Sequence, residues 1–518
     1  MSTRRALLAA GFLIVAFAGL SLWEMSGDSL TTDERWHLPV GYAYWKTGEF
    51  RLSPEHPPLA KLLCAAPLLS MDLRLPPVTP PPGKTWHDYP APFGSAFFRL
   101  NPDVDRILFR SRLPVVAMGV LLLLTIFLWS WRLHGDPRAG LLSLALAALE
   151  PTLIAHSHYV TTDMALAAFG LPAFAALWCF STAARPRWLG LAVVAMGLAL
   201  ASKFSALVLL PIFFLLLVLR WPARRAPLAA AIGALAVMAI IVQASYFFSP
   251  DLTLYLRGPG EVRAYQPVDY PAYVLGAFHV GGVWWYAPFA WLIKTPLPTL
   301  ALMALGLVLC LRDPRRVRET RDFILVPAVV YGLAVCLLTA NLGVRYLIPT
   351  TAFLLVPAGA AYRWLASTRL RRAAAVGLGL WLAVSVFHAA PHFIAYFNEA
   401  IGGPARAPAV IHDSNVDWGQ DLERLARYQQ EHRIPELVLF YWGGAQPEAY
   451  GVRYRPLTAE MARAGRPPAG TYAISVNNLI EMKKSVVLGG GDPNVDWLAR
   501  FRPADRVGYS IYIYRFGL

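Results

Sequence analysis

The sequence predicts a multi-spanning α-helical membrane protein of about 11 transmembrane helices, followed by a small C-terminal α/β soluble domain. Hydrophobic residues make up 56% of the 518 positions and charged residues only 15%, which exceeds the apolar content of soluble domains. Apolar runs long enough to cross a bilayer recur as far as about residue 390. Arginines gather in alternate loops between these runs, which predicts a defined orientation in the membrane.

The predicted spans are apolar runs of roughly 17 to 22 residues, the length that crosses a bilayer core. They cover residues 5–23, 111–131, 138–155, 162–181, 188–202, 204–220, 226–246, 287–311, 322–340, 346–364 and 373–390. The first run has a second interpretation, a cleaved signal peptide, because Arg4 and Arg5 precede it. No clear small-x-small cleavage site follows it at Leu22-Trp23-Glu24-Met25.

The basic residues predict which side of the membrane each loop occupies. Arginines follow the second, fourth, sixth, eighth and tenth runs: Arg132, Arg138, Arg185, Arg187, Arg220, Arg224, Arg225, Arg312, Arg315, Arg316, Arg318, Arg321, Arg363, Arg369, Arg371 and Arg372. The opposite short loops carry only Lys203 and Arg345. The positive-inside rule therefore predicts a cytoplasmic N-terminus in an inner (cytoplasmic) membrane. The same asymmetry explains the net charge of +15 without a nucleic-acid partner.

Three parts are then expected outside the cytoplasm: loops 24–110 and 247–286 of a transmembrane domain 1–390, and a periplasmic or extracellular domain 391–518. In that domain, apolar positions at helical spacing predict a helix over 420–432. Apolar and aromatic runs predict strands at 436–442, 471–476 and 509–514. Together these elements indicate an α/β module.

A short acidic motif occurs twice in this tail. Asp413-x-Asn415-Val416-Asp417-Trp418 is repeated as Asp492-x-Asn494-Val495-Asp496-Trp497. A calcium loop is one interpretation, but Gly419 stands one place later than an EF-hand requires and the twelfth position lacks glutamate. Helix capping and turn formation by Asp and Asn is the interpretation we favour. The four cysteines lie in or beside apolar segments and predict no disulfide framework.

Ionisable residues concentrate at the predicted outward ends of the spans, where they are costly unless function retains them. The acids and histidines are Asp33, Glu34, His37, Glu55, His56, His156, His158 and Asp163, and the cations are Lys203, Lys294 and Arg345. Acids together with cations suit a reaction in which a hydroxyl loses a proton while a phosphate leaves. The structural alternative is that each group solvates a helix end, especially His156, His158 and Glu150.

Five motifs, in order along residues 1–390, resemble those of protein O-mannosyltransferases and lipid A aminoarabinose transferases. They are Thr32-Asp33-Glu34, His56-Pro57-Pro58-Leu59, Thr162-Asp163, Lys294-Thr295-Pro296-Leu297-Pro298 and Val344-Arg345-Tyr346-Leu347-Ile348-Pro349. Both families belong to the C-type (GT-C) glycosyltransferase superfamily. The resemblance implies a GT-C-like fold and an inverting, mannosyltransferase-like transfer from a polyprenyl-phosphate sugar to a hydroxyl of a protein, lipid or glycan.

The resemblance also implies roles for residues of this chain. Asp33 would be the catalytic base, with Glu34 beside it in acceptor or donor binding. Repulsion between the two carboxylates would raise one pKa and help the base. Donor phosphate would lie against Lys203, Arg345 and Tyr346. The remaining substrate-binding residues would be His56, Asp163, His158 and Lys294.

The chain departs from these families in its C-terminal soluble part, since the mannosyltransferases carry an inserted β-trefoil. No cofactor is required by this chemistry, although part of the superfamily uses a divalent metal, which Glu55 and His56, with His156, would ligate here. A transporter or flippase for a sugar or lipid-linked sugar is the main alternative function, and a glycan-binding sensor is a third. Transporters place ionisable groups near the bilayer midplane, which the positions above do not favour.

Overall fold

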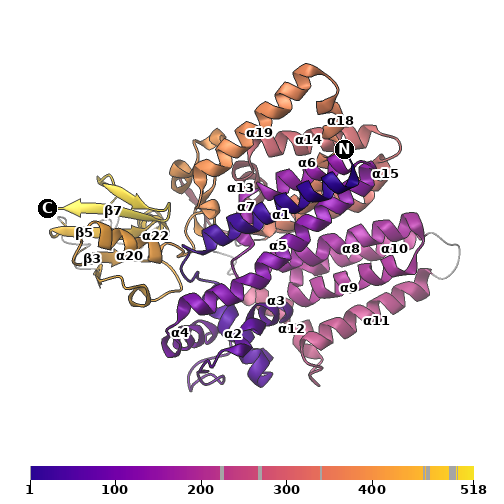
Figure 1. Cartoon of the computed structure of the whole chain (residues 1–518). Helices are drawn as coiled ribbons and strands as arrows, with labels where there is room; N and C mark the ends of the chain where they lie inside the picture. Colours follow the sequence, from indigo (N-terminus) through magenta and orange to yellow (C-terminus); the bar gives the residue numbers. More distant parts are fainter. Residues whose placement is uncertain are drawn as a thin grey trace.

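The computed structural model describes residues 2–517, apart from 222–226, 266–270, 339–340, 459–460, 462–466, 489–497 and 499. Arg224, Arg225 and the second copy of the acidic motif therefore lie outside the described residues. Helices dominate up to residue 389, and a mixed sheet follows near the C-terminus. Figure 1 shows the N-terminus and this sheet at opposite ends of the long helices.

Each of the eleven predicted runs contains helix. The long helices are α1 (Thr3–Met25), α5 (Val104–His134), α8 (Asp163–Ala183), α9 (Pro186–Ser202), α11 (Pro227–Ser245) and α19 (Arg369–Ala389). The shorter ones are α6 (Pro137–Ala148), α7 (Pro151–His156), α10 (Leu209–Leu219), α13 (Tyr286–Lys294), α14 (Leu297–Arg312), α15 (Val317–Thr320), α16 (Val326–Cys336), α17 (Ile348–Ala358) and α18 (Ala361–Ala366). Among the described residues, six spans pass tests of length and hydropathy, or seven if the 110° bend between α13 and α14 lies within one span. The count of about 11 stays a prediction.

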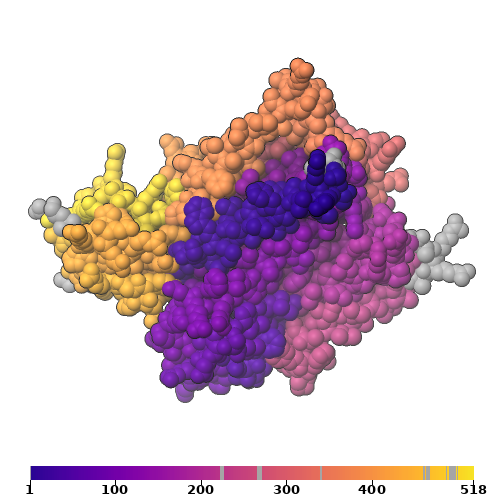
Figure 2. Space-filling view, in the orientation of Figure 1, coloured from indigo at the N-terminus to yellow at the C-terminus, as the bar shows by residue number. Residues whose placement is uncertain are grey.

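Large apolar side chains on the outer faces of several helices indicate contact with lipid. On α1, Leu8, Phe12 and Val15 are exposed, and Figure 2 shows this helix lying across the surface with one side uncovered. On α19, Leu380 and Val384 are exposed in the same way. In water these surfaces would be unfavourable, whereas in a bilayer they need no further partner.

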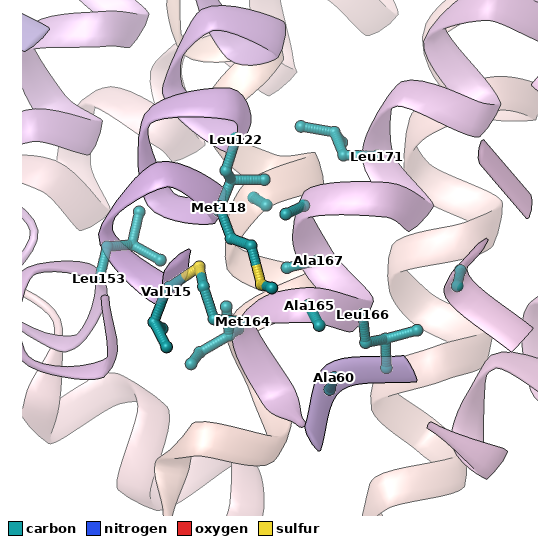
Figure 3. Packing of buried hydrophobic residues seen from close by; sticks show 14 of the residues in the cluster. Ala60, Val115, Met118, Leu122, Leu153, Met164, Ala165, Leu166, Ala167 and Leu171 are labelled. Atoms are coloured by element: carbon teal, nitrogen blue, oxygen red, sulfur yellow. The ribbon is translucent and has the colours of Figure 1, made fainter. Parts of the chain in front are cut away.

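The interior of the helical part is a continuous apolar core around α5, α8 and α17. Figure 3 shows Val115, Met118 and Leu122 of α5 facing Met164 and Ala167 of α8. Small residues on α8 let these helices approach closely, as in other membrane bundles. This packing fixes the start of α8, where Asp163 lies.

A layer of short helices covers the end of the bundle nearest the sheet. It consists of α2 (Glu34–Thr47), α3 (Leu59–Ala65), α4 (Pro90–Leu100) and α12 (Thr253–Tyr265), with the small hairpin β1 (Ala272–Val274) and β2 (Ala277–His279). In α2, Asp33 occupies the N-cap position and Glu34 the first turn. Successive residues of a helix point about 100° apart, so these two acids face different surroundings.

The C-terminal sheet has the strand order β4-β3-β5-β7-β6. Its strands are β3 (Leu437–Phe440), β4 (Tyr454–Pro456), β5 (Gly470–Ser475), β6 (Asp505–Val507) and β7 (Ile511–Phe516), with helices α20 (Leu422–Glu431) and α22 (Val476–Val487). β3 pairs in parallel with β4 and β5, and β7 pairs antiparallel with β5 and β6. The predicted helix and three strands are confirmed within a few residues, while β4, β6 and α22 were not predicted.

The segment between the helical bundle and the C-terminal sheet contributes side chains to the core of the bundle. Phe393, Ile394 and Trp418 belong to the main apolar core. The Ile394 N–H donates to Glu24 Oε1 at 3.0 Å, and the Ser29 N–H donates to the Gln420 carbonyl at 2.9 Å. The division at residue 390 stays a prediction, because residues on the C-terminal side of it contribute to the core of the helical part.

Candidate active site

A cavity of about 270 Å³ opens between the short helices α2, α4 and α12 and the bundle. Its polar lining consists of Asp33, His37, Glu55, His56, Lys203, Ser205, Tyr331, Arg345 and Tyr346. Its apolar lining includes Phe204, Val262, Val335, Leu338 and Leu342. A cavity with this mixed lining suits a ligand that has a charged head and a long apolar tail.

Two acids and two cations from four separate segments meet beside this cavity. Arg345 Nη1 lies 2.6 Å from Asp33 Oδ2 and 3.9 Å from Asp163 Oδ2. Lys203 Nζ forms an ion pair with Asp163 Oδ1. All four residues lie at or within two positions of a helix boundary, so the bundle presents them together at one end. The sequence-based grouping of these residues is therefore seen in space.

Tyr346 completes the cationic side of the cavity. Its ring lies 4.7 Å from Lys203 Nζ and 5.3 Å from the guanidinium carbon of Arg345. A ring face beside two cations attracts both and fixes their position. In the part of the chain that the structure describes, Arg345 Nε is buried without a hydrogen-bond partner. The described protein groups therefore leave one donor of the guanidinium unused.

The charge of Arg345 controls the protonation of Asp33. Burial raises the pKa of Asp33, but the charge of Arg345 and the hydrogen bond that it donates, together with His37, bring the pKa below its ordinary value. Asp33 is therefore an ionised carboxylate at neutral pH. The expectation that repulsion from Glu34 raises this pKa is wrong, because an arginine, and not Glu34, lies against Asp33.

Glu34 faces away from the cavity into a closed network. Arg112 Nε donates to Glu34 Oε1 at 2.8 Å and Arg112 Nη2 donates to Oε2 at 2.7 Å. The backbone N–H groups of Thr31 and Val160 also donate to this carboxylate, at 3.1 and 3.2 Å. Its side chain is 0% exposed. The structure therefore does not bring Glu34 to the site at which its neighbour Asp33 lies.

A second group of polar side chains lines the cavity around His56. The rings of His37 and His56 are 5.6 Å apart, and burial lowers the pKa of His37 to about 4, so that it is neutral at pH 7. Burial also lowers the pKa of His56. Within the described residues, His37 Nδ1, His56 Nδ1 and Glu55 Oε2 are buried without hydrogen-bond partners. Unpartnered polar atoms in a cavity are suited to bind hydroxyl groups.

Three other expected substrate-binding or metal-binding residues contact protein groups and do not line the cavity. Lys294 Nζ donates to three backbone carbonyls, those of Ile394, Tyr396 and Asn415, at 2.7 to 3.2 Å. His158 Nε2 lies 3.1 Å from Asp28 Oδ2. The third, His156, packs its ring 5.7 Å from that of Trp418. These contacts indicate structural roles.

The three expected metal ligands do not converge. Glu55 contacts Ser53 and lies 3.6 Å from Lys61 Nζ, while His156 packs against Trp418. The described residues contain no group of three His, Cys, Asp or Glu side chains arranged to hold a metal ion. The residues present do not fit a three-ligand site, so we derive no step through a metal.

Sequence reasoning missed the part of the tail that reaches this site. Residues Asp413–Asn415 form a short 3₁₀ turn, and Asp417 Oδ1 accepts the Gly419 N–H at 3.0 Å, which confirms turn formation by the first acidic motif. Trp418 then lies 4.5 Å from the guanidinium carbon of Arg345. The recurring Asp-Trp pair was the available signal, but no local pattern links it to Arg345.

Comparison with known proteins supports the same fold. Residues 91–246 match the model of the dolichyl-phosphate-mannose-protein mannosyltransferase family. No curated protein matches the chain. ArnT from Cupriavidus metallidurans, in its crystal structure bound to undecaprenyl phosphate, is similar over 99% of this chain and 98% of ArnT, with 13% identity and a TM-score of 0.50.

Two further structures are less similar. The Archaeoglobus fulgidus oligosaccharyltransferase in its apo form is similar over 88% of this chain and 64% of the oligosaccharyltransferase chain, with 13% identity and a TM-score of 0.48. The S. cerevisiae protein O-mannosyltransferase Pmt1-Pmt2 complex bound to the sugar donor is similar over 51% of this chain and 34% of the chain compared, with 18% identity and a TM-score of 0.29. The ArnT likeness alone supports a fold assignment here. The chain therefore has the membrane-embedded GT-C fold, and its resemblance to the GT-C glycosyltransferases is confirmed.

Proposed function

We propose that the protein is an inverting glycosyltransferase that moves a sugar from a polyprenyl-phosphate donor to a hydroxyl acceptor on the outer face of the membrane. One observation carries this proposal: Lys203 and Arg345 lie together in the lining of a cavity that also has an apolar lining, made by Phe204, Val262, Val335, Leu338 and Leu342. A cation pair next to an apolar channel matches a phosphate on an isoprenoid chain. The matches to a mannosyltransferase family and to ArnT point to the same donor class.

The phosphate would replace carboxylates as the partner of the cations. Arg345 offers Nε, which has no partner in the described part of the chain, and a planar guanidinium can hold two phosphate oxygens. Lys203 adds a point charge beside the ring of Tyr346. Fixed positive charges of this kind stabilise a departing phosphate more than protonation would, because a phosphate is already a good leaving group.

Asp33 is our candidate for the base. The acceptor hydroxyl gives its proton to an Asp33 carboxylate oxygen while the acceptor oxygen forms a bond to the anomeric carbon. The bond from that carbon to the phosphate oxygen breaks, and polyprenyl phosphate leaves with the electron pair. When phosphate binds Arg345, the arginine compensates Asp33 less, so the carboxylate becomes a stronger base in the donor complex.

The other polar groups of the cavity have supporting roles in this scheme. Asp163 would hold Lys203 and Arg345 in place, as its contacts to both indicate. His37, His56 and Glu55 would bind hydroxyls of the sugar or acceptor, since each has a buried atom with no partner among the described residues. The acceptor is a protein, lipid or glycan hydroxyl.

The orientation in the membrane is part of the proposal. With about 11 spans and arginines on the inner side, the cavity and the C-terminal sheet face outward, and the N-terminus lies in the cytoplasm. The charged residues lie at helix ends and away from helix centres, which favours an interfacial transfer over a midplane transport site.

The direct test incubates the purified protein with a panel of polyprenyl-phosphate sugars, mannose and aminoarabinose among them, and measures the release of polyprenyl phosphate. We expect release from one donor, and faster release when its acceptor is present. Asp33→Asn is the matched control, because it keeps the size of the side chain. Absence of release from every donor, together with movement of a lipid-linked sugar across vesicles, would favour the flippase.

A further inference from the structure

Trp418 of the tail lies directly behind the phosphate-binding arginine. Its side chain is 1% exposed, and its ring lies 4.5 Å from the guanidinium carbon of Arg345. A desolvated guanidinium over an indole face is a favourable contact that also limits how the guanidinium can turn. Arg345 is thus held between Trp418, Tyr346 and Asp33.

The indole is itself held in place by packing. Its ring meets the rings of His156 at 5.7 Å and Tyr159 at 5.4 Å, both edge to face. Edge-to-face packing defines the orientation of each ring. The carbonyl of Trp418 accepts the N–H of Thr32 at 3.1 Å. Trp418 therefore contacts Arg345 through its ring and the residue before Asp33 through its backbone.

The backbone around Trp418 is fixed to the segment that carries Arg345. The Val344 N–H donates to Asn415 Oδ1 at 3.0 Å, and the Asn415 carbonyl accepts from Lys294 at 2.7 Å. Gly343 has φ +158°, and a Cβ on it would lie 2.5 Å from Ser414 Oγ. The tail and the start of the Arg345 segment therefore lie in close contact, and a side chain at position 343 would require Ser414 to shift.

We propose that Trp418 is a positioning residue that holds the Arg345 guanidinium in the orientation that binds the donor phosphate. This inference rests on the proposed function, since it assigns a partner to the cation that binds the leaving phosphate. It gives the C-terminal part of the chain a role in donor binding. The donor contacts Arg345, and Trp418 acts through that arginine.

The experiment measures binding of polyprenyl phosphate to detergent-purified full-length protein. Trp418→Leu removes the ring face and keeps an apolar side chain, so we expect binding to weaken about tenfold, or about 1.4 kcal/mol. Trp418→Phe keeps a smaller ring face and should weaken binding only about threefold. Trp129→Leu is the matched control. That tryptophan is 2% exposed and packs against Trp178 and Phe353, away from the cavity.

A second readout separates positioning from general stability. If Trp418 aligns Arg345 against Asp33, Trp418→Leu should also move the acid limb of kcat/KM to higher pH, whereas Trp129→Leu should leave it in place. Should Trp418→Leu fail to fold, the kinetics of Trp418→Phe test the positioning role. We expect its donor KM to rise about threefold at unchanged kcat.

The outcomes separate this inference from the proposed function. Wild-type protein that binds no polyprenyl phosphate contradicts both. Wild-type binding that is weakened equally by Trp418→Leu and Trp129→Leu, or by neither, overturns the role of Trp418 and leaves the transferase intact. For the fallback variant, an unchanged donor KM in Trp418→Phe has the same meaning.

Discussion

Asp33 and Glu34 are neighbours in the chain, and each forms an ion pair with an arginine, but the two pairs differ in completeness. Glu34 meets Arg112 through two hydrogen bonds, and Arg112 also donates to the carbonyls of Met25, Asp28 and Ser29. Both side chains are at most 1% exposed. Asp33 meets Arg345 through one contact at the edge of a cavity, with 17% of its side chain exposed.

The difference shows how one type of interaction serves two purposes. A buried pair with every donor and acceptor used is costly to break and offers nothing to a ligand. A pair with a free donor and access to a cavity can exchange partners when a phosphate arrives. Saturation of hydrogen bonds and access to the cavity therefore separate the Glu34 pair from the Asp33 pair, which charge alone does not.

The largest expected effect is that of a substitution in the Asp33–Arg345 pair. Asp33→Asn keeps size and hydrogen bonding but removes the basic oxygen, so transfer should fall about 10²–10⁴-fold. Thermal stability should change little, and donor binding should stay the same or rise, because one negative charge near the phosphate is gone. Rates and donor Kd are measured on one preparation. Near-normal turnover would remove Asp33 as the base, and the same assay on Asp163→Asn would show whether the base lies there.

The equivalent substitution in the Glu34–Arg112 pair tests whether that pair has a structural role. Glu34→Gln leaves the Arg112 charge buried without a counter-ion, and we expect a loss of about 3–5 kcal/mol in stability. Activity per folded molecule should stay close to that of the wild type. Thermal unfolding in detergent and specific activity after removal of aggregates check both points. A stable but inactive Glu34→Gln protein would show that this carboxylate takes part in chemistry.

Replacing each arginine by lysine sharpens the contrast. Arg345→Lys keeps a charge but loses the planar fork, so the donor KM should rise about tenfold, and Arg345→Ala should weaken donor use further. A lysine at position 112 cannot contact Glu34 and three carbonyls together. Arg112→Lys should therefore lower stability more than it changes the donor KM. The donor KM of each variant is measured by steady-state kinetics on the folded fraction. Equal and negligible effects of both changes at Arg345 would exclude it from the phosphate site.

The smallest expected effect is a change in pH dependence. Arg345 holds the pKa of Asp33 below its ordinary value, against the opposing effect of burial. An acid with a lowered pKa stays ionised as the pH falls, so the acid limb of kcat/KM lies at low pH in the wild type. Without Arg345 the effect of burial remains, and the limb should move to higher pH in Arg345→Ala. An unmoved limb would mean that another group sets it.

The helices were predictable because their signals are local. Each apolar run contains helix, and strands β3, β5 and β7 follow from apolar runs such as Leu437–Phe440. The breaks within the runs were less visible, because the bend between α13 and α14 depends on how neighbouring helices pack. The short strands β4 and β6 carry too few apolar residues to show a strand pattern.

The site was predictable in composition and less so in geometry. Asp33, Asp163, Lys203 and Arg345 were grouped from their positions at the ends of runs, and they do meet. The opposite directions of Asp33 and Glu34 depend on the start of α2, and the partner of Glu34 is 78 positions away. Arg112 stands at the start of an apolar run, where its cost in a membrane was a usable sign. The Trp418 contact joins distant segments and has no local signature.

The position of Lys294 has a consequence for how the protein is made. Its ammonium lies in a segment expected to enter the membrane, and its partners are carbonyls of Ile394, Tyr396 and Asn415, which the ribosome adds about a hundred residues later. Until that later chain has folded against the bundle, the Lys294 ammonium lacks these three hydrogen-bond acceptors, which is costly in lipid. A molecule whose synthesis stops before residue 394 therefore lacks all three acceptors of the Lys294 ammonium.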